Sequence, residues 1–113
     1  ACVGCFAADA HHKGFRAIEG KIKIGNLDFA LINNETSGFF KIVADARTGV
    51  VIGGQIVSPN ASYLISLVLL AIKKGMKVGA LASLACDKLG EIQGIKEAAR
   101  ACSRALKRQQ RTL

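Results

Sequence analysis

The apolar segment Tyr63–Ile72 constrains this sequence most, because a helix built from it carries almost no polar surface. Its sequence, YLISLVLLAI, has only Ser66 and the Tyr63 hydroxyl as polar groups. A helix that is apolar on every side has to be buried on every side. A membrane-spanning helix needs roughly 20 apolar residues, so this segment is too short and we expect no membrane span. We expect a sheet to cover one side of the helix and a second subunit to cover the other.

Two strands and a tight turn precede this helix. Phe39–Ala44 alternates its residues as a strand with one buried face does, and Val50–Val57 returns as its partner. Between them, Asp45 suits the first position of a type I turn, and Gly49 supplies the positive φ that closes such a loop. The glycine pair at 53–54 is a poor strand former, so it predicts a bulge or a close approach by another backbone. We therefore predict a β-hairpin here.

The other predicted elements complete one α+β domain over residues 1–113. Strands are expected at Ala1–Cys5 and Phe15–Ile24, and helices at Ala7–Lys13, at Val78–Cys86 and from about Glu91 onward. Gly75 is expected to cap the apolar helix. This order predicts a mostly antiparallel sheet of about five strands with helices packed on one face.

Basic residues are concentrated near the C-terminal end. The net charge is +8 at neutral pH, and six basic residues but only one acidic residue, Glu97, fall between Lys96 and Arg111. Residues 103–113 are expected to form a basic helix end or tail. Such a surface can bind nucleic acid or another anionic partner, but no aromatic residue is interleaved to stack on bases. We favour a solvated helix face and do not expect nucleic acid as a partner.

Four cysteines stand at positions 2, 5, 86 and 102. Cys2 and Cys5 have the C-x-x-C spacing of a redox pair or of half a zinc site. No second C-x-x-C follows, and strand residues three apart point to opposite faces of a sheet. We interpret the thiols as buried or incidental, and keep Cys2 and Cys5 only as weak candidates for a metal site.

Motifs for nucleotide binding or hydrolysis are absent from the sequence. There is no GxGxxG, no Walker A loop and no HExxH. The N-terminus also lacks the basic region and sustained apolar core of a signal peptide. From the residues alone we expect a cytoplasmic protein without a nucleotide site of its own.

The segment Gly38–Leu64 closely resembles the C-terminal dimerisation domain of the FAD-dependent pyridine nucleotide-disulfide oxidoreductases, among them dihydrolipoamide dehydrogenase, glutathione reductase and mercuric reductase. The resemblance continues through the helix to Gly75 and reaches about Cys102. It implies a homodimer, and it implies an excised domain whose FAD and NAD(P)H domains lie N-terminal to this chain. The interface candidates under this resemblance are Tyr63, Leu64, Leu67, Val68, Ala71 and Ile95.

The catalytic pair of many family members is replaced in this sequence. Lys88 stands where the resemblance places an acid/base histidine, and Gln93 where it places the glutamate that orients it. Lysine titrates near a pKa of about 10.4 and is a poor proton shuttle at neutral pH. Mercuric reductases also lack this histidine. Ser58 stands where the family has glycine, and Tyr63 where it has glutamate.

Two functions follow from these observations. The first is a dimerisation domain of a mercuric reductase-like or dihydrolipoamide dehydrogenase-like flavoenzyme, which supplies subunit pairing but no catalysis alone. The alternative is a catalytically retired, stand-alone binding protein that uses its basic tail for nucleic acid or an acidic partner.

Overall fold

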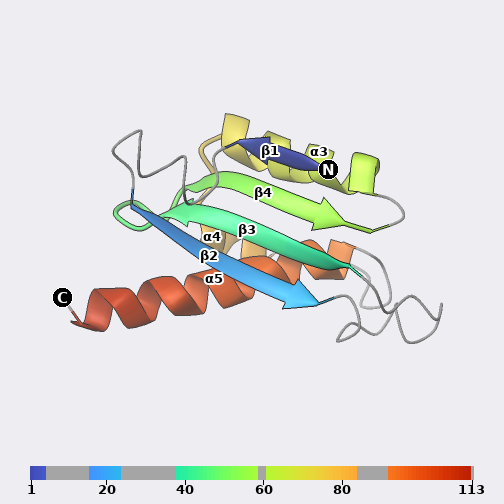
Figure 1. Ribbon diagram of the computed structural model, residues 1–113. Coiled ribbons are helices and arrows are strands. Elements are labelled where there is room, and N and C mark those ends of the chain that lie inside the picture. Colours follow the sequence, from blue (N-terminus) through green and yellow to red (C-terminus); the bar gives the residue numbers. More distant parts are fainter. Residues whose placement is uncertain (5–15, 24–37, 59–60, 84–91, 113) are drawn as a thin grey trace.

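The computed structural model describes residues 1–4, 16–23, 38–58, 61–83 and 92–112. Their strands are β1 (Cys2–Gly4), β2 (Ala17–Lys23), β3 (Phe39–Asp45) and β4 (Val51–Val57). They form one antiparallel sheet in the order β1-β4-β3-β2 (Figure 1). The predicted α+β class and antiparallel sheet are confirmed, with four strands among the described residues.

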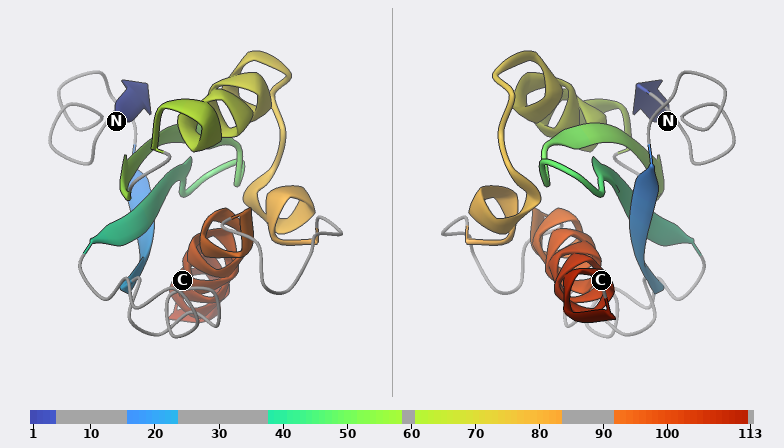
Figure 2. Two further views of the ribbon diagram at one scale, coloured as in Figure 1. Left: turned by 90° about the vertical axis from the view of Figure 1, so that its right-hand side faces the viewer. Right: turned by 90° about the vertical axis from the view of Figure 1, so that its left-hand side faces the viewer.

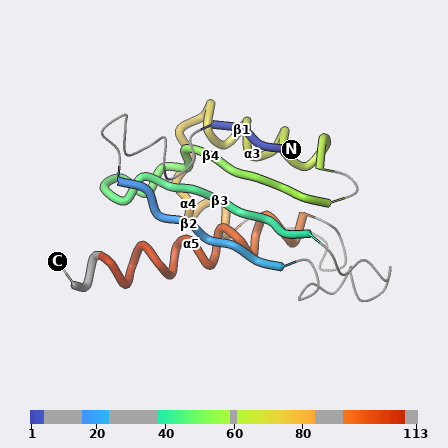
Figure 3. Tube along the Cα trace, viewed as in Figure 1, coloured from blue at the N-terminus to red at the C-terminus, as the bar shows by residue number. Residues whose placement is uncertain are grey.

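The helices all cover the same face of this sheet (Figure 2). They are α3 (Ala61–Lys73), α4 (Val78–Ala82) and α5 (Ile92–Thr112). Helix α3 lies over β4 and β1, α5 lies over β2 and β3, and α4 packs beside α5. The tube in Figure 3 shows how α5 runs on beyond the sheet toward the C-terminus. The helix expected at Ala7–Lys13 falls outside the described residues.

The β3–β4 hairpin is closed by Asp45, as predicted. Its carbonyl oxygen accepts a hydrogen bond from the Gly49 N–H at 2.7 Å. Its carboxylate accepts one from the Arg47 N–H at 3.0 Å and one from the Thr48 hydroxyl at 3.3 Å. Gly49 has a φ of 77°, a left-handed conformation that a side chain disfavours. Local hydrogen bonds therefore determine this turn.

The glycine pair in β4 has both of the predicted effects. The register between β3 and β4 shifts between Val43 and Ala44, which marks a bulge. A Cβ on Gly54 would lie 2.8 Å from Cγ1 of Val68, so α3 packs directly on the β4 backbone. The missing side chain sets how closely α3 approaches the sheet.

Helix α3 ends in the predicted glycine cap. Gly75 has a φ of 66°, and its N–H donates to the Ile72 carbonyl at 3.1 Å. The Met76 N–H reaches back to the Ala71 carbonyl at 2.9 Å, which completes a Schellman motif. The Met76 carbonyl then accepts from the Val51 N–H at 2.9 Å, so the cap also ties the helix end to β4.

The core fills the space between the sheet and the three helices. Its inward side chains on the strands are Phe40, Ile42, Ala44, Val51 and Ile56, and those on the helices are Leu64, Val68, Ala71, Val78, Leu81, Ile95, Ala98, Ala99 and Cys102. All of these are buried. The apolar side chains are thus buried mainly within this one chain, but α3 also carries apolar side chains that are exposed.

Candidate subunit interface

Helix α3 has one buried face, and some of its apolar side chains are exposed away from the sheet. Leu64, Val68 and Ala71 face the sheet and are buried. On the opposite side Tyr63 is 83% exposed, Leu69 41% and Leu70 52%. We call these three residues the α3 stripe. The sheet covers one side of this helix, as predicted, and the side for which a second subunit was expected is exposed in the single chain.

Helical geometry places two residues of the α3 stripe on the same side of the helix. Tyr63 and Leu70 are seven residues apart, which places them on the same side of the helix two turns apart. Ser66 lies between them, and its hydroxyl donates back to the Ser62 carbonyl at 3.4 Å. That internal bond reduces the demand of Ser66 for water. No helix among the described residues is long and apolar enough to cross a membrane.

The structure distributes the six predicted interface residues over different environments. Tyr63 is exposed, and Leu67 is half-buried against the core. Leu64, Val68, Ala71 and Ile95 are buried in the core of this chain, so their side chains support the helices from within instead of facing a partner. In the single chain these four side chains lie between the sheet and the helices.

Sequence reasoning did not identify Leu69 and Leu70 as exposed residues. An all-apolar helix offers no polar face by which to tell its inner side from its outer side. The signal that could have found them is Gly54, because a glycine in a strand predicts a close approach. The residue that makes this approach is Val68, and residues roughly half a turn from Val68, such as Leu70, then face outward.

Gln93, at the position given to the family's orienting glutamate, makes a local contact on α5. The Gln93 amide donates to the Glu97 carboxylate at 2.7 Å along α5, and the same carboxylate pairs with Arg100 at 3.3 Å. Lys88 lies outside the described residues. Ser58, at the family's glycine position, has a buried hydroxyl with no hydrogen-bond partner among the described residues.

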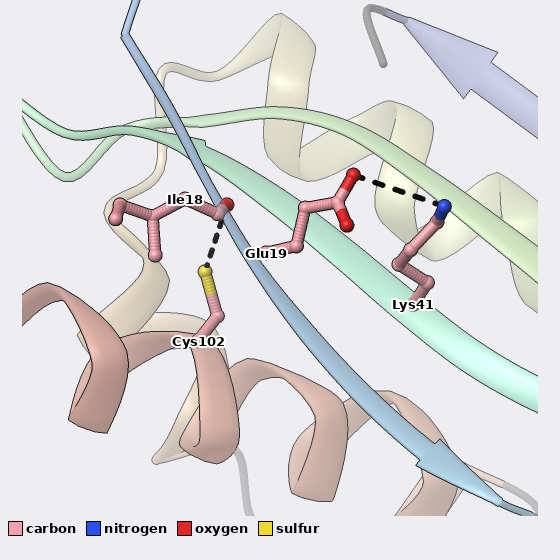
Figure 4. Close-up of polar contacts among 4 residues, drawn as sticks. All are labelled: Ile18, Glu19, Lys41 and Cys102. Atoms are coloured by element: carbon pink, nitrogen blue, oxygen red, sulfur yellow. Dashed lines mark hydrogen bonds and ion pairs between the residues drawn. The ribbon is translucent and has the colours of Figure 1, made fainter. Parts of the chain in front are cut away.

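The two described thiols have opposite environments. Cys2 is exposed on β1, and Cys102 is buried on α5 beneath β2, where its thiol donates to the Ile18 carbonyl at 3.4 Å (Figure 4). Glu19, next to Ile18, pairs with Lys41 at 3.8 Å. Cys5 lies outside the described residues. No group of three or more metal-ligating side chains occurs among the residues that the structure describes.

Burial makes Cys102 a poor nucleophile. Desolvation raises the pKa of its thiol from an ordinary 9.0 to about 12, a backbone hydrogen bond at Ala44 opposes this, and the charge of Glu19 adds to it. Because the folded-state pKa is raised, the thiol stabilises the fold below about pH 9 and loses this contribution as the pH rises toward 12.

We expect iodoacetamide to label Cys2 quickly at pH 8 and to label Cys102 only on unfolding, since the thiolate is the nucleophile. Peptide mapping by mass spectrometry distinguishes the two sites. Stability measured above pH 9 should also decline more steeply in the wild type than in Cys102→Ala. Equal labelling of both thiols in the native protein would contradict the environment described for Cys102.

Comparisons with known proteins agree with this architecture. The family model "Pyridine nucleotide-disulphide oxidoreductase, dimerisation domain" matches residues 1–86. Mercuric reductase from Serratia marcescens is 36% identical over 107 residues, which is 95% of this chain and 23% of the relative. Dihydrolipoyl dehydrogenase from Geobacillus stearothermophilus is 42% identical over 94 residues, 81% of this chain and 20% of the relative.

A solved structure shows the same fold. The crystal structure of LpdA from Mycobacterium tuberculosis matches with a TM-score of 0.80 and 30% identity, over 88% of this chain and 22% of that one. The chain thus spans about a fifth of the length of the curated relatives it matches. With the matched family model and the antiparallel sheet covered by helices on one face, the chain belongs to the pyridine nucleotide-disulphide oxidoreductase dimerisation-domain family.

Proposed function

We propose that this chain joins two subunits of an FAD-dependent reductase of the mercuric or dihydrolipoyl type, and that the α3 stripe lies in their contact. The observation that carries the proposal is the exposed apolar surface of Tyr63, Leu69 and Leu70 on α3. Membership in a dimerisation-domain family supports pairing of like chains. Alone, the chain supplies this pairing and no catalysis.

Twofold symmetry suits such a stripe. In a symmetric dimer the same patch of each subunit faces its copy on the other, so each apolar residue of the patch is buried in both subunits. Tyrosine is enriched in the cores of protein interfaces, because its ring is apolar and its hydroxyl can still reach water. Lys73 is the last residue of α3, and its ammonium group is exposed to water beyond the stripe. The stripe therefore resembles a small interface core with a polar rim.

We expect the chain to be a dimer in solution and Leu70→Glu to weaken its self-association by roughly a hundredfold, because a symmetric contact buries the introduced carboxylate in both copies. Sedimentation equilibrium over a range of concentrations measures this. The matched control is Ile92→Glu, since Ile92 is 40% exposed and belongs to a different helix, α5.

The control should dimerise as the wild type does. The same dissociation constant for Leu70→Glu and the wild type, with both folded, would place the contact elsewhere. A wild-type chain that is monomeric at every concentration would refute pairing by the isolated domain.

We assign the flavin and the nicotinamide cofactor to other parts of the parent enzyme. Dinucleotides bind at the carboxyl ends of parallel strands, next to a glycine-rich turn and a helix. The sheet among the described residues is antiparallel throughout, so these residues do not form a site of that kind. We expect the reading frame that contains it to yield a yellow flavoprotein when expressed whole, and a colourless product would count against this assignment.

A further inference from the structure

Exposed cations gather along one side of α5 and at the start of α4. We call them the α5 basic surface, which consists of Lys77, Arg100, Arg104, Lys107 and Arg108. Arg100, Arg104 and Arg108 follow one another at intervals of four residues, which aligns them along the helix. The single acidic residue of the helix, Glu97, is engaged by Gln93 and Arg100. Little negative charge on α5 itself therefore offsets this surface.

Two adjoining hollows shape the α5 basic surface. One, of about 480 Å³, is bordered by Ala101, Arg104, Lys107 and Arg108. The other, of about 340 Å³, lies between the β3–β4 turn, α4 and α5, and Lys77 and Lys107 stand at it. Lys107 borders both hollows, so the two lie next to each other along α5.

The fold does not require this charge. Like charges spaced four residues apart on a helix destabilise it by about 0.2–0.5 kcal/mol per pair, and α5 has two such pairs among its three aligned arginines. The helix dipole favours cations only in the last turn, whereas Arg100 lies well before Thr112, the end of α5. Packing against the sheet is made by the opposite side of α5, through Ile95, Ala98, Ala99 and Cys102.

We propose that the α5 basic surface binds an acidic segment of a partner protein that also carries small apolar side chains. The charge calls for carboxylates, which arginine can bind in a bidentate way. The smaller hollow adds apolar and backbone surface from Gly49, Val78, Gly79, Ala80 and Leu106. A peptide can pack an apolar side chain against this surface, whereas the charged phosphate backbone of a nucleic acid cannot.

Two other occupants fit less well. A single-stranded nucleic acid would stack its bases on aromatic side chains, and neither hollow has an aromatic residue among its described lining. A second copy of this chain has a net charge of +8, so charge repulsion opposes its approach to this surface. The proposed ligand is therefore a different protein.

The α5 basic surface is independent of the proposed subunit contact. Helix α3 lies over β4 and β1, while α5 lies over β2 and β3 (Figure 2). A dimer formed through α3 would leave one basic surface on each subunit accessible. The two proposals can consequently fail separately, since one is measured by self-association and the other by peptide binding.

The experiment uses a fluorescein-labelled peptide that alternates glutamate with leucine, and fluorescence anisotropy with the whole chain. We expect micromolar binding that weakens steeply with added salt. Arg104→Gln combined with Lys107→Gln should weaken it by roughly tenfold or more. The matched control is Lys21→Gln with Lys23→Gln, which removes the same charge from exposed positions on β2.

Every outcome bears on the proposal. Retained binding in the β2 control, with loss in the α5 variant, supports it, provided circular dichroism shows both variants folded. If both variants lost the same peptide affinity, binding would depend only on the net charge of the chain, and the proposal would be overturned. Equal binding of a peptide with glutamine in place of glutamate would overturn it, and so would tighter binding of a mixed-sequence duplex DNA, which would reassign the surface to nucleic acid.

Discussion

Gly20→Ala is expected to destabilise the fold by roughly 3 kcal/mol or more, because overpacking against rigid backbone is costly. Gly20 is buried in β2 where α5 crosses the strand. A Cβ at this position would lie 2.2 Å from the Ala98 carbonyl oxygen, 2.2 Å from the Cys102 nitrogen and 2.7 Å from the Cys102 Cα. These are backbone atoms of a helix, so no side chain can rotate away to make room.

Urea unfolding followed by circular dichroism measures this effect. Gly79→Ala in α4 is the matched control, since nothing lies within 4 Å of a Cβ there. Because alanine has a higher helix propensity than glycine, the free energy of unfolding of the control should rise by up to about 1 kcal/mol. An unfolding midpoint for Gly20→Ala at or above that of the wild type would show that β2 and α5 are not in the contact described here.

Phe40→Ala is expected to cost roughly 3–5 kcal/mol, the usual range for removing a buried aromatic ring. Phe40 is fully buried in β3 and lies directly under α5. A Cβ on Gly94 would come within 2.4 to 2.5 Å of three carbons of its ring, so the glycine is what lets the helix start rest on the ring. The loss of the ring leaves a cavity that the first turn of α5 cannot fill.

The neighbouring phenylalanine supplies the control for this change. Phe39 lies on the other face of β3, half-buried, with the Lys21 ammonium 4.3 Å from its ring centre. A cation–π contact at an exposed site contributes about 0.5–1 kcal/mol, so Phe39→Ala should cost far less than Phe40→Ala. Calorimetric or urea-based unfolding free energies compare the two, and equal costs would contradict the assignment of Phe40 to the core.

Both predictions concern contacts that were only partly foreseeable from the sequence. The alternation of Phe40, Ile42 and Ala44 with Lys41 and Asp45 predicts that Phe40 lies on the buried face, and the structure confirms this. Gly20 lies inside a predicted strand, which indicates a close approach, but the sequence does not identify Ala98 and Cys102 as the residues that make it. The contact of Gly94 with Phe40 also joins residues distant along the chain. The sequence likewise does not determine that β2 pairs with β3, as it does in the structure.

The candidate interface shows the same division. The family resemblance, stated on the hairpin and the helix after it, is confirmed by the matched family model, and it points to α3. It does not indicate which side of α3 faces a partner. Four of the six expected interface residues are buried in the core, whereas Leu69 and Leu70, which were not predicted, are exposed on the same helix as Tyr63.

The sequence by itself determined the features that depend on neighbours along the chain. The Asp45–Gly49 turn, the Gly75 cap and the apolar nature of α3 all rest on hydrogen bonds or side chains a few residues apart. Only the tertiary structure decided which face of α3 remains exposed. The physical reason is that an all-apolar helix gains similar free energy from burying any of its sides, so the choice depends on the shape of the surface it meets. Here that surface is the bare backbone at Gly54, which accepts Val68 and leaves Leu70 outside.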